Sequence, residues 1–284
     1  MPELPEVETI RRGLSKSIIK SELKKTTILC EKSFIGEPTT GLVKDIRRFG
    51  KALIIDLENG TSLMIHLRMT GQLIYDDAEK PRYAAGHPSD NFTDKLPNKQ
   101  TRVILELNTG TLYFNDQRKF GFIKVLPTKE VKNDAFIRKL APEPWTMSAD
   151  ELYQKLQKHK NSCVKATILD QTIICGLGNI YADEALFAAR IHPERKSGTI
   201  TKKETELLLE AAKDVMEKSI ESGGSTMATY VKADGTKGDY LEKFAKVFHR
   251  EGKNCPICNE KIIKIKVAGR GTHICPNCQK KEQK

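Results

Sequence analysis

The chain has 284 residues, 38% of them hydrophobic, which is enough for about two domains with ordinary cores. It carries 48 Lys and Arg against 37 Asp and Glu, a formal charge of +11, and this excess favours a polyanionic partner such as nucleic acid. No apolar run approaches the ~20 residues of a membrane span, and the acidic, proline-bearing start is unlike a secretory signal. We therefore expect a cytoplasmic protein with no membrane contact.

The first half of the chain is predicted to be mostly β-structure behind one helix. Residues 5–19 have an apolar stripe at helical spacing, with Pro5 in the first turn. Strand pairs around Asn59-Gly60 and Asn108-Thr109-Gly110 predict hairpins at 52–67 and 103–114. Residues 76–100 are polar and rich in Pro, Gly, Asn and Asp, which predicts a long loop. Residues 1–130 are accordingly interpreted as one domain.

The second half changes to helical periodicity. Residues 131–147 contain two prolines and are interpreted as a linker. Ser148 and Thr201 each begin a capping box, and 161–170 and 180–189 are predicted as helices. A helical domain follows the linker.

That helical domain is expected to span residues 148–245. Gly223-Gly224 ends its last amphipathic helix, as glycine does at helix C-termini. Residues 225–245 are polar and punctuated by glycine, which predicts a second long loop.

The seven cysteines fall into two groups. Cys30, Cys163 and Cys175 stand among apolar residues and are predicted to be buried thiols. The others form two C-x2-C pairs, 16 residues apart: Cys255, Cys258, Cys275 and Cys278. This spacing lets four thiolates surround one tetrahedral Zn²⁺, and a site closed by four thiolates is structural rather than catalytic. Two unrelated cysteine pairs are the alternative.

The segment between the cysteine pairs predicts a β-hairpin, so residues 246–284 are interpreted as a zinc finger. Arg270 stands at the hairpin tip between two glycines. A small backbone there allows close approach to a phosphate, which a guanidinium grips bidentately. A solvated turn residue is the alternative for Arg270.

Six segments stand out, in order along nearly the whole chain. They are Pro2-Glu-Leu-Pro-Glu-Val-Glu-Thr-Ile-Arg-Arg-Gly13, His66-Leu-Arg-Met-Thr-Gly71, Asn115-Asp-Gln-Arg-Lys-Phe-Gly121, Gly176-Leu-Gly-Asn-Ile-Tyr-Ala-Asp-Glu184, Gly223-Gly-Ser-Thr226 and the cysteine module. Together they resemble the formamidopyrimidine-DNA glycosylases (the Fpg/MutM family). The resemblance implies an α+β multidomain fold. Its parts are a β-sandwich-like N-terminal domain with a helix, a helix–two-turn–helix domain and a β-hairpin zinc finger, with DNA between the lobes.

The resemblance implies that Pro2 is a nucleophile once Met1 is removed. An α-amino group has a reference pKa of ~7.7–8.0, so part of it is unprotonated near neutrality. Attack of this secondary amine on sugar C1′ gives an iminium that permits strand cleavage by elimination. Glu3 is the expected acid–base partner and Glu6 an orienting group, while Lys51 and Arg270 act in elimination and contact phosphate. From spacing alone, residues 2–6 are better explained as the start of a helix.

The resemblance also assigns contacts to the duplex. Extruding a damaged base costs a few kcal/mol, and the void must be filled. The residues assigned to DNA binding are His66, Met69, Gln100, Arg118, Phe120, Lys160 and Asn179, of which Met69, Arg118 and Phe120 fill the void. By pattern alone Met69 and Phe120 suit a core, and Asn179 suits a helix N-cap. Lys155, Lys158 and Lys165 are expected to add basic charge, and residues 225–240 correspond to a loop over the extruded purine.

Three short segments depart from the family pattern. Lys99-Gln100-Thr101-Arg102 replaces a pair of histidines, Phe49 replaces an arginine, and Phe248-His249-Arg250 replaces Tyr-Gly-Arg. All three lie near expected DNA contacts, so affinity and strand selectivity are the properties in doubt.

The leading hypothesis is a base-excision DNA-repair enzyme, a glycosylase and AP lyase that removes 8-oxoguanine and formamidopyrimidines from duplex DNA. It is expected to be monomeric, to contain one structural Zn²⁺ and to associate with a bacterial nucleoid when acting. A catalytically silent zinc-dependent DNA-binding protein is one alternative. A glycosylase for oxidised pyrimidines is another, which Leu4 disfavours because that branch typically has glycine there.

Overall fold

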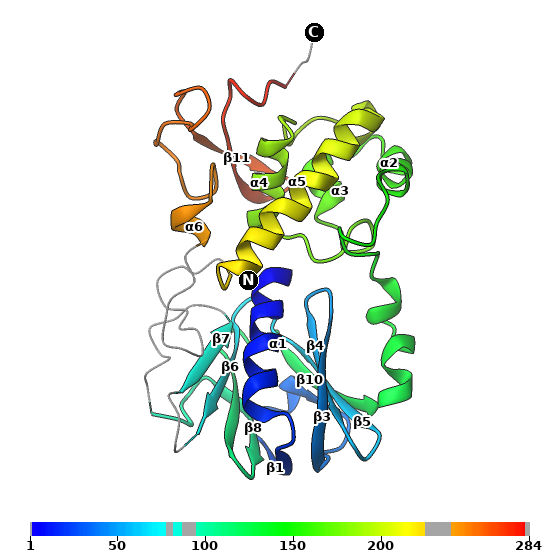
Figure 1. Cartoon of the computed structure of the whole chain (residues 1–284), viewed down its shortest axis with the longest axis vertical. Helices are drawn as coiled ribbons and strands as arrows, with labels where there is room; N and C mark the ends of the chain where they lie inside the picture. The colour runs from blue at the N-terminus through cyan, green and yellow to red at the C-terminus, as the bar shows by residue number, and fades with distance from the viewer. Residues whose placement is uncertain (1, 78–81, 87–94, 225–239, 282–284) are drawn as a thin grey trace. The chain divides into compact units, whose positions relative to one another are not determined.

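The computed structural model describes residues 2–77, 82–86, 95–224 and 240–281 and divides the chain into two compact units. The first unit comprises Met1–Arg138 and Ser222–Asp239, and the second comprises Lys139–Glu221 and Tyr240–Lys284. Their elements are drawn in Figure 1. In the described part of the chain, no helix combines the length and the apolar character needed to cross a membrane.

The first unit is one helix and a ten-stranded sheet whose strand order is β2-β10-β5-β4-β3-β1-β8-β9-β6-β7. The elements are α1 (Leu4–Ile18), β1 (Glu22–Ile28), β2 (Phe34–Ile35), β3 (Gly41–Phe49), β4 (Ala52–Leu57), β5 (Thr61–His66), β6 (Gly71–Asp76), β7 (Tyr83–Gly86), β8 (Thr101–Leu107), β9 (Gly110–Asp116) and β10 (Phe122–Pro127). The pairs are antiparallel except β2 with β10. The two predicted hairpins are therefore confirmed as β4–β5 and β8–β9.

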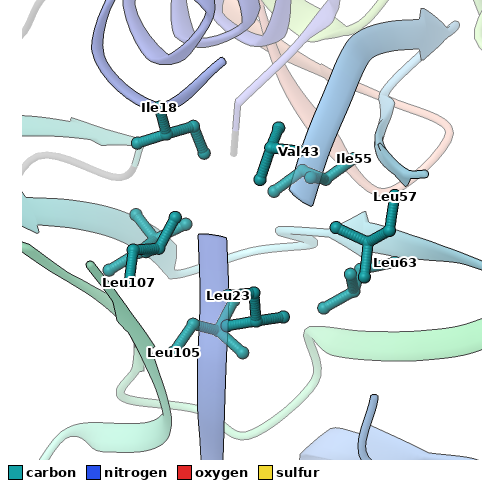
Figure 2. Close-up of a pocket in the computed structure, with 9 residues that line it drawn as sticks. Ile18, Leu23, Val43, Ile55, Leu57, Leu63, Leu105 and Leu107 are labelled. Atoms are coloured by element: carbon teal, nitrogen blue, oxygen red, sulfur yellow. The ribbon is translucent and has the colours of Figure 1, made fainter. Parts of the chain in front are cut away.

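A large hydrophobic core lies between the two halves of this sheet and α1. Side chains from both halves meet there, including Leu53 and Leu63 on one side and Leu73 and Leu105 on the other. Figure 2 shows aliphatic side chains from α1 and the strands turned toward one another around a cavity of about 10 Å³. A space of that size holds at most one water and has no polar lining, so it is a packing defect rather than a ligand site.

The strand β7 lies inside the segment 76–100, which the sequence predicted to be a loop, so that prediction is wrong for residues 83–86. The strand is held by α1 as well as by β6. Tyr83 Oη donates to the Thr9 carbonyl (3.3 Å), and a Cβ on Gly13 would lie 2.3 Å from the Tyr83 ring. Because these contacts are distant in sequence, the local polar composition did not reveal them.

The second unit contains the helices α2 (Ala149–Lys158), α3 (Val164–Ile168), α4 (Asn179–Ala188), α5 (Lys202–Glu221) and α6 (Tyr240–Lys243). Ser148 Oγ accepts from Glu151 N (3.1 Å), which is one half of the predicted capping box, and Thr201 and Glu204 form both halves of theirs. The helix predicted over 161–170 is shorter than expected. Gly223 follows α5 with a φ of +82°, which glycine adopts without strain, so the predicted stop is confirmed.

The same unit ends in the zinc-finger hairpin of β11 (Ile263–Val267) and β12 (Arg270–Ile274), which are antiparallel. Beside it, Phe187 of α4 clusters with Val247, Ile262 and two cysteines. The α+β multidomain fold is thus confirmed. Of the three cysteines predicted as buried thiols, Cys175 is buried, whereas Cys30 and Cys163 are half-buried.

Candidate active site and nucleic-acid interface

The start of α1 brings the predicted acid–base residues beside Pro2. Glu3 is the N-cap residue, and Glu6 lies in the first turn of the helix. The Glu3 N–H donates to Glu6 Oε2 (2.8 Å), and the two residues form a reciprocal capping box. Pro2 is buried, and Glu3 and Glu6 are 2% and 6% exposed. The helix start and the cluster of candidate catalytic groups are therefore one structure, and the two interpretations of residues 2–6 do not exclude each other.

A carboxylate that the sequence did not single out joins α1 to the β3–β4 hairpin. Glu8 accepts hydrogen bonds from Arg11 (2.8 Å), Arg12 (2.8 Å) and Arg48 (3.1 Å). Burial acts to raise the pKa of Glu8, but the hydrogen bonds from these arginines and the charge of Arg11 outweigh it and lower the pKa to about 2. Glu8 is therefore ionised throughout the neutral range.

Lys51 lies in the turn of that hairpin. Phe49 pairs with Ala52 across the hairpin, Gly50 has a φ of +55°, and Arg48 Nη1 donates to the Gly50 carbonyl (3.0 Å). Lys51 is 7% exposed, so it is not a solvated lysine at the end of a strand. Arg48 thus connects the Glu8 carboxylate directly to the backbone that carries Lys51.

His66 ends β5, where it is paired with Ala52 and Phe122. Burial and the nearby positive charges of Arg68 and Lys51 lower its pKa to about 3, so the imidazole is neutral at physiological pH. Its Nδ1 accepts from the Arg68 N–H (3.1 Å), and the ring packs edge-on to Phe136 at 5.1 Å. A phosphate contact by His66 would therefore use a neutral hydrogen-bond donor, the Nε2–H.

The three residues assigned to fill the void are all exposed on two turns of the first unit. Met69 and Phe120 are 39% and 54% exposed. Neither side chain therefore lies in the core, which is where the sequence pattern alone would put a methionine and a phenylalanine. Arg118 is exposed, and its guanidinium carbon lies 4.9 Å from the centroid of the Phe120 ring. Gln100 is half-buried, and its carbonyl accepts from the N–H of Asp116, which begins the Arg118 turn (2.9 Å).

In the second unit, the structure brings Asn179 to the hairpin that carries Arg270. Asn179 is the first residue of α4, and its Nδ2 donates to the Gly271 carbonyl (3.0 Å). Gly178 is the N-cap of α4, so the alternative of Asn179 as the N-cap is wrong. Arg270 is exposed and follows the Ala268-Gly269 turn as the first residue of β12. An exposed arginine therefore directly precedes the residue that Asn179, at the N-terminus of α4, binds, and both an arginine and a helix N-terminus are suited to phosphate.

One expected contributor of surface charge is instead a structural residue. Lys165 is fully buried, and its Nζ donates to Asp183 Oδ1 (2.5 Å) and Thr272 Oγ1 (2.7 Å). The expectation that Lys165 adds to a basic surface is wrong, because its charge is compensated inside the unit. Lys160, by contrast, is exposed, and its backbone carbonyl accepts from the Gly198 N–H (3.2 Å).

A second buried carboxylate that the sequence did not single out supports the zinc finger. Glu184 of α4 accepts from the backbone N–H groups of Lys246, Val247 and Phe248 at 2.7–2.9 Å. Burial raises its pKa, although these three hydrogen bonds oppose the shift.

Phe248, which replaces the tyrosine of the family pattern, is buried, and its ring packs edge-on to His273 at 5.0 Å. The segment 225–239, which includes nearly all of the expected loop over the purine, lies outside the described residues.

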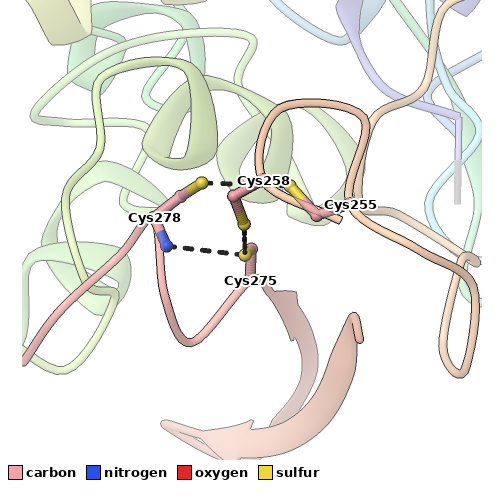
Figure 3. A group of neighbouring side chains, drawn as sticks. All are labelled: Cys255, Cys258, Cys275 and Cys278. Atoms are coloured by element: carbon pink, nitrogen blue, oxygen red, sulfur yellow. Dashed lines mark hydrogen bonds between the residues drawn. The ribbon is translucent and has the colours of Figure 1, made fainter. Parts of the chain in front are cut away.

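The four predicted zinc ligands form one cluster, with all four sulfur atoms within 4.8 Å of one another. Cys258 Sγ and Cys275 Sγ are 3.4 Å apart, and Cys255 Sγ and Cys278 Sγ are 3.9 Å apart (Figure 3). Tetrahedral coordination with Zn–S bonds of ~2.3 Å implies sulfur separations of roughly 3.8 Å, so the cluster fits Zn²⁺. A metal held by four thiolates has no open position and serves to fold the module.

Comparison with known proteins agrees with this geometry along the whole chain. Residues 1–123 match the formamidopyrimidine-DNA glycosylase N-terminal domain, residues 140–231 match the formamidopyrimidine-DNA glycosylase H2TH domain, and residues 252–281 match the zinc finger found in FPG and IleRS. The formamidopyrimidine-DNA glycosylase of Desulfitobacterium hafniense (strain DSM 10664 / DCB-2) is 39% identical over 98% of this chain and 100% of that protein. The chain belongs to the formamidopyrimidine-DNA glycosylase family. It is a DNA-repair glycosylase with AP-lyase activity.

Other relatives in this family are similar over the same length. The formamidopyrimidine-DNA glycosylase of Streptococcus pyogenes serotype M6 is 38% identical over 99% of both chains. The MutM (Fpg) protein of Thermus thermophilus superposes with a TM-score of 0.86 at 33% identity, covering 99% of this chain and 100% of that one. A point mutant of Lactococcus lactis FPG, in complex with DNA containing Fapy-dG, gives a TM-score of 0.87 at 32% identity with the same coverage.

Proposed function

We propose that this glycosylase excises oxidised purines, 8-oxoguanine and formamidopyrimidines, from duplex DNA and uses the nitrogen of Pro2 as its nucleophile. The observation that carries the proposal is the arrangement at the start of α1. There the capping box holds the buried carboxyl groups of Glu3 and Glu6 beside residue 2. With Met1 removed, the secondary amine of Pro2 stands next to an acid–base group.

The reaction proceeds in two stages, excision of the base and then elimination of the two phosphates. The Pro2 nitrogen attacks sugar C1′, the N-glycosidic bond breaks, and the base leaves with the bonding electrons and takes up a proton. The amine proton passes to O4′, the C1′–O4′ bond breaks as the sugar ring opens, and the nitrogen lone pair forms an iminium at C1′, which acidifies the C2′ proton. Removal of that proton expels the 3′ phosphate, and a second elimination expels the 5′ phosphate. In this proposal Glu3 moves the protons at C1′.

The basic residues have complementary roles in this proposal. Lys51 contacts phosphate and assists the first elimination, and Arg270 contacts phosphate and assists the second. His66, Gln100, Lys160 and Asn179 hold the backbone, and Met69, Arg118 and Phe120 occupy the void left by the extruded base. The exposure of these last three supports that role, because apolar side chains and a guanidinium at a protein surface are available to stack against bases.

Duplex DNA as the partner is supported by the charge of +11 and by solved relatives. Those relatives include Lactococcus lactis Fpg with DNA containing an abasic site and a MutM with DNA containing carbocyclic 8-oxo-G. The enzyme is proposed to act as a monomer, in the cytoplasm, on nucleoid DNA. Its zinc finger is proposed to hold Arg270 against the backbone.

A panel of end-labelled duplexes tests the substrate. One strand carries 8-oxoguanine, a formamidopyrimidine, an oxidised pyrimidine or an undamaged guanine, and strand cleavage is followed with the zinc-loaded, Met1-processed protein. We expect cleavage at the two purine lesions, at rates at least about tenfold above the pyrimidine lesion, and none at guanine. Preferential cleavage at the pyrimidine lesion would contradict the substrate proposal, and binding without cleavage would contradict the reaction.

A further inference from the structure

Two turns of the first unit share the same backbone feature at their tips. The first joins β5 to β6 through Arg68 and Met69, and the second joins β9 to β10 through Lys119 and Phe120. In each turn an exposed apolar side chain directly follows a non-glycine residue with left-handed backbone, because Arg68 has a φ of +51° and Lys119 a φ of +57°. Such backbone is strained for residues with a Cβ and persists only when the surrounding structure holds it.

One buried carboxylate holds both turns. Asp116, the last residue of β9, is fully buried. It accepts a hydrogen bond from Thr70 Oγ1 in the first turn, and in the second turn it accepts from Arg118 N (3.1 Å) and Gly121 N (2.7 Å). The Arg118 N–H also lies 3.0 Å from Thr70 Oγ1, so the two turns are joined to each other as well as to the carboxylate.

The backbones at the base of these turns pack too tightly for a side chain. A Cβ on Gly121 would lie 2.8 Å from the Phe114 ring and 2.9 Å from the His66 carbonyl oxygen. A Cβ on Gly71 would lie 2.4 Å from the Leu67 carbonyl oxygen. The tips carrying Met69 and Phe120 therefore stand on a base with little freedom to shift.

We infer that Asp116 and Thr70 are positioning residues that hold the Met69 turn and the Arg118–Phe120 turn as a single rigid wedge. The inference rests on the proposed function of these turns in filling the void. Base extrusion is unfavourable by itself, so side chains already ordered for insertion lose less entropy on binding than mobile ones. A carboxylate suits the role because both of its oxygens accept hydrogen bonds. In an amide, one of these oxygens is replaced by an NH₂ group, which would face a hydrogen-bond donor of the Met69 turn or of the Arg118–Phe120 turn.

The test compares Asp116→Asn and Thr70→Val with the wild type, with Thr70→Ser as the variant that keeps the hydroxyl. The matched control is Asp134→Asn, because Asp134 is another carboxylate that accepts from a backbone N–H, that of Phe136 (2.8 Å), outside these turns. Single-turnover cleavage is measured on a duplex with an oxidised purine and on the same duplex with a preformed abasic site, where no base needs to be extruded. Thermal unfolding confirms that each variant is folded.

Asp116→Asn and Thr70→Val are expected to slow excision of the purine by about tenfold or more, and to slow abasic-site cleavage by less than about threefold. Thr70→Ser should stay near the wild type on both substrates, as should Asp134→Asn. Equal slowing of both reactions, or slowing no greater than in Asp134→Asn, would overturn the inference. If Asp116→Asn does not fold, the contrast between Thr70→Val and Thr70→Ser gives the result.

A second measurement reports the wedge without any excision. A duplex carries an uncleavable tetrahydrofuran abasic analogue with 2-aminopurine opposite, and the fluorescence change at saturating protein reports insertion beside the orphaned base. Asp116→Asn and Thr70→Val should give less than about half of the wild-type change, and an unaltered change would overturn the inference. A wild type that gives the change but excises no oxidised purine would contradict the proposed substrate alone.

Discussion

Two hairpins of this protein carry the cations proposed to meet the DNA backbone, and they are stabilised in different ways. The β3–β4 hairpin with Lys51 rests on the large apolar core of the first unit and on the Glu8–Arg48 ion pair. The β11–β12 hairpin with Arg270 rests on a small cluster containing two of the four cysteines and on a hydrogen bond from the His273 N–H to the Asp183 carboxylate. A hydrophobic core stabilises the hairpin that carries Lys51, whereas a metal and buried hydrogen bonds stabilise the hairpin that carries Arg270.

The largest expected effect comes from removing the metal, which should destabilise one hairpin and not the other. Cys258→Ser, or chelation of zinc, should unfold the β11–β12 hairpin and leave the β-sheet unit folded, because four thiolates replace a core in the small module. Duplex affinity should fall as well, because the hairpin that carries Arg270 is lost. Hydrogen exchange measured by mass spectrometry reports each hairpin separately.

Cys30→Ser is the matched control for metal removal, because this thiol lies in the first unit, outside the cluster. It should alter neither hairpin. Equal loss of protection in β3–β4 and β11–β12 after chelation would show that the two are not stabilised independently.

Glu8→Gln should weaken the first hairpin by removing the charge that Arg11, Arg12 and Arg48 share. Since two of these arginines are partly exposed, the free energy of unfolding at pH 7 should fall by about 1–3 kcal/mol. The pKa of Glu8 is lowered from 4.5 to about 2, so the stabilisation is complete above pH 4.5 and is lost as the pH falls toward 2.

Chemical denaturation of the wild type and Glu8→Gln between pH 2 and 7 measures this difference. Glu58→Gln, at an exposed turn position, is the control and should have little effect. A difference between the wild type and Glu8→Gln that persists at pH 2 would contradict the assignment of the ion pairs.

The pKa of His66 is lowered like that of Glu8, but in His66 the favoured form is the neutral one. Its pKa is about 3 in the folded protein against 6.5 in the unfolded chain, so between these values only the unfolded chain binds the proton. Its contribution to stability is therefore complete above pH 6.5 and declines as the pH falls toward 3. The His66 ring resonance in NMR spectra should not move between pH 5 and 8, and a midpoint near 6.5 would contradict its neutral state.

Arg270→Ala should have the smallest effect on the folded protein, because the side chain is exposed and follows a turn. The slope of duplex affinity against salt concentration should fall by about one charge, since one phosphate contact is lost. Arg270→Lys keeps the charge and should keep the slope. An unchanged slope in Arg270→Ala would remove this residue from the interface.

The two hairpins also differ in how far the sequence revealed them. The zinc finger was predicted together with its ligands, because the C-x2-C spacing records the coordination geometry within a short segment. The ion pair that stabilises the β3–β4 hairpin was not predicted, because Glu8 and Arg48 are 40 residues apart and no local pattern connects them. Asp183, Glu184 and Asp116 were missed for the same reason, since their partners are defined only by the tertiary fold.

The errors have physical causes as well. Lys165 was taken for a surface cation, because a lysine in a basic segment gives no sign of a buried carboxylate partner. Residues 83–86 were placed in a loop, because Tyr83-Ala-Ala-Gly86 has little of the β-branched character that marks a strand. The fold class and the N-terminal motif were nevertheless predicted, because several specific segments occur in order along the chain.

The most direct measurement is borohydride trapping of the covalent intermediate on a duplex containing 8-oxoguanine. The wild type, with Met1 removed as verified by intact mass, should form an adduct that peptide mapping locates at Pro2. Pro2→Gly should form much less, because a primary amine replaces the secondary one. A zinc-loaded, Met1-processed protein that forms no adduct, or forms it at a lysine instead, would contradict the role of the Pro2 nitrogen.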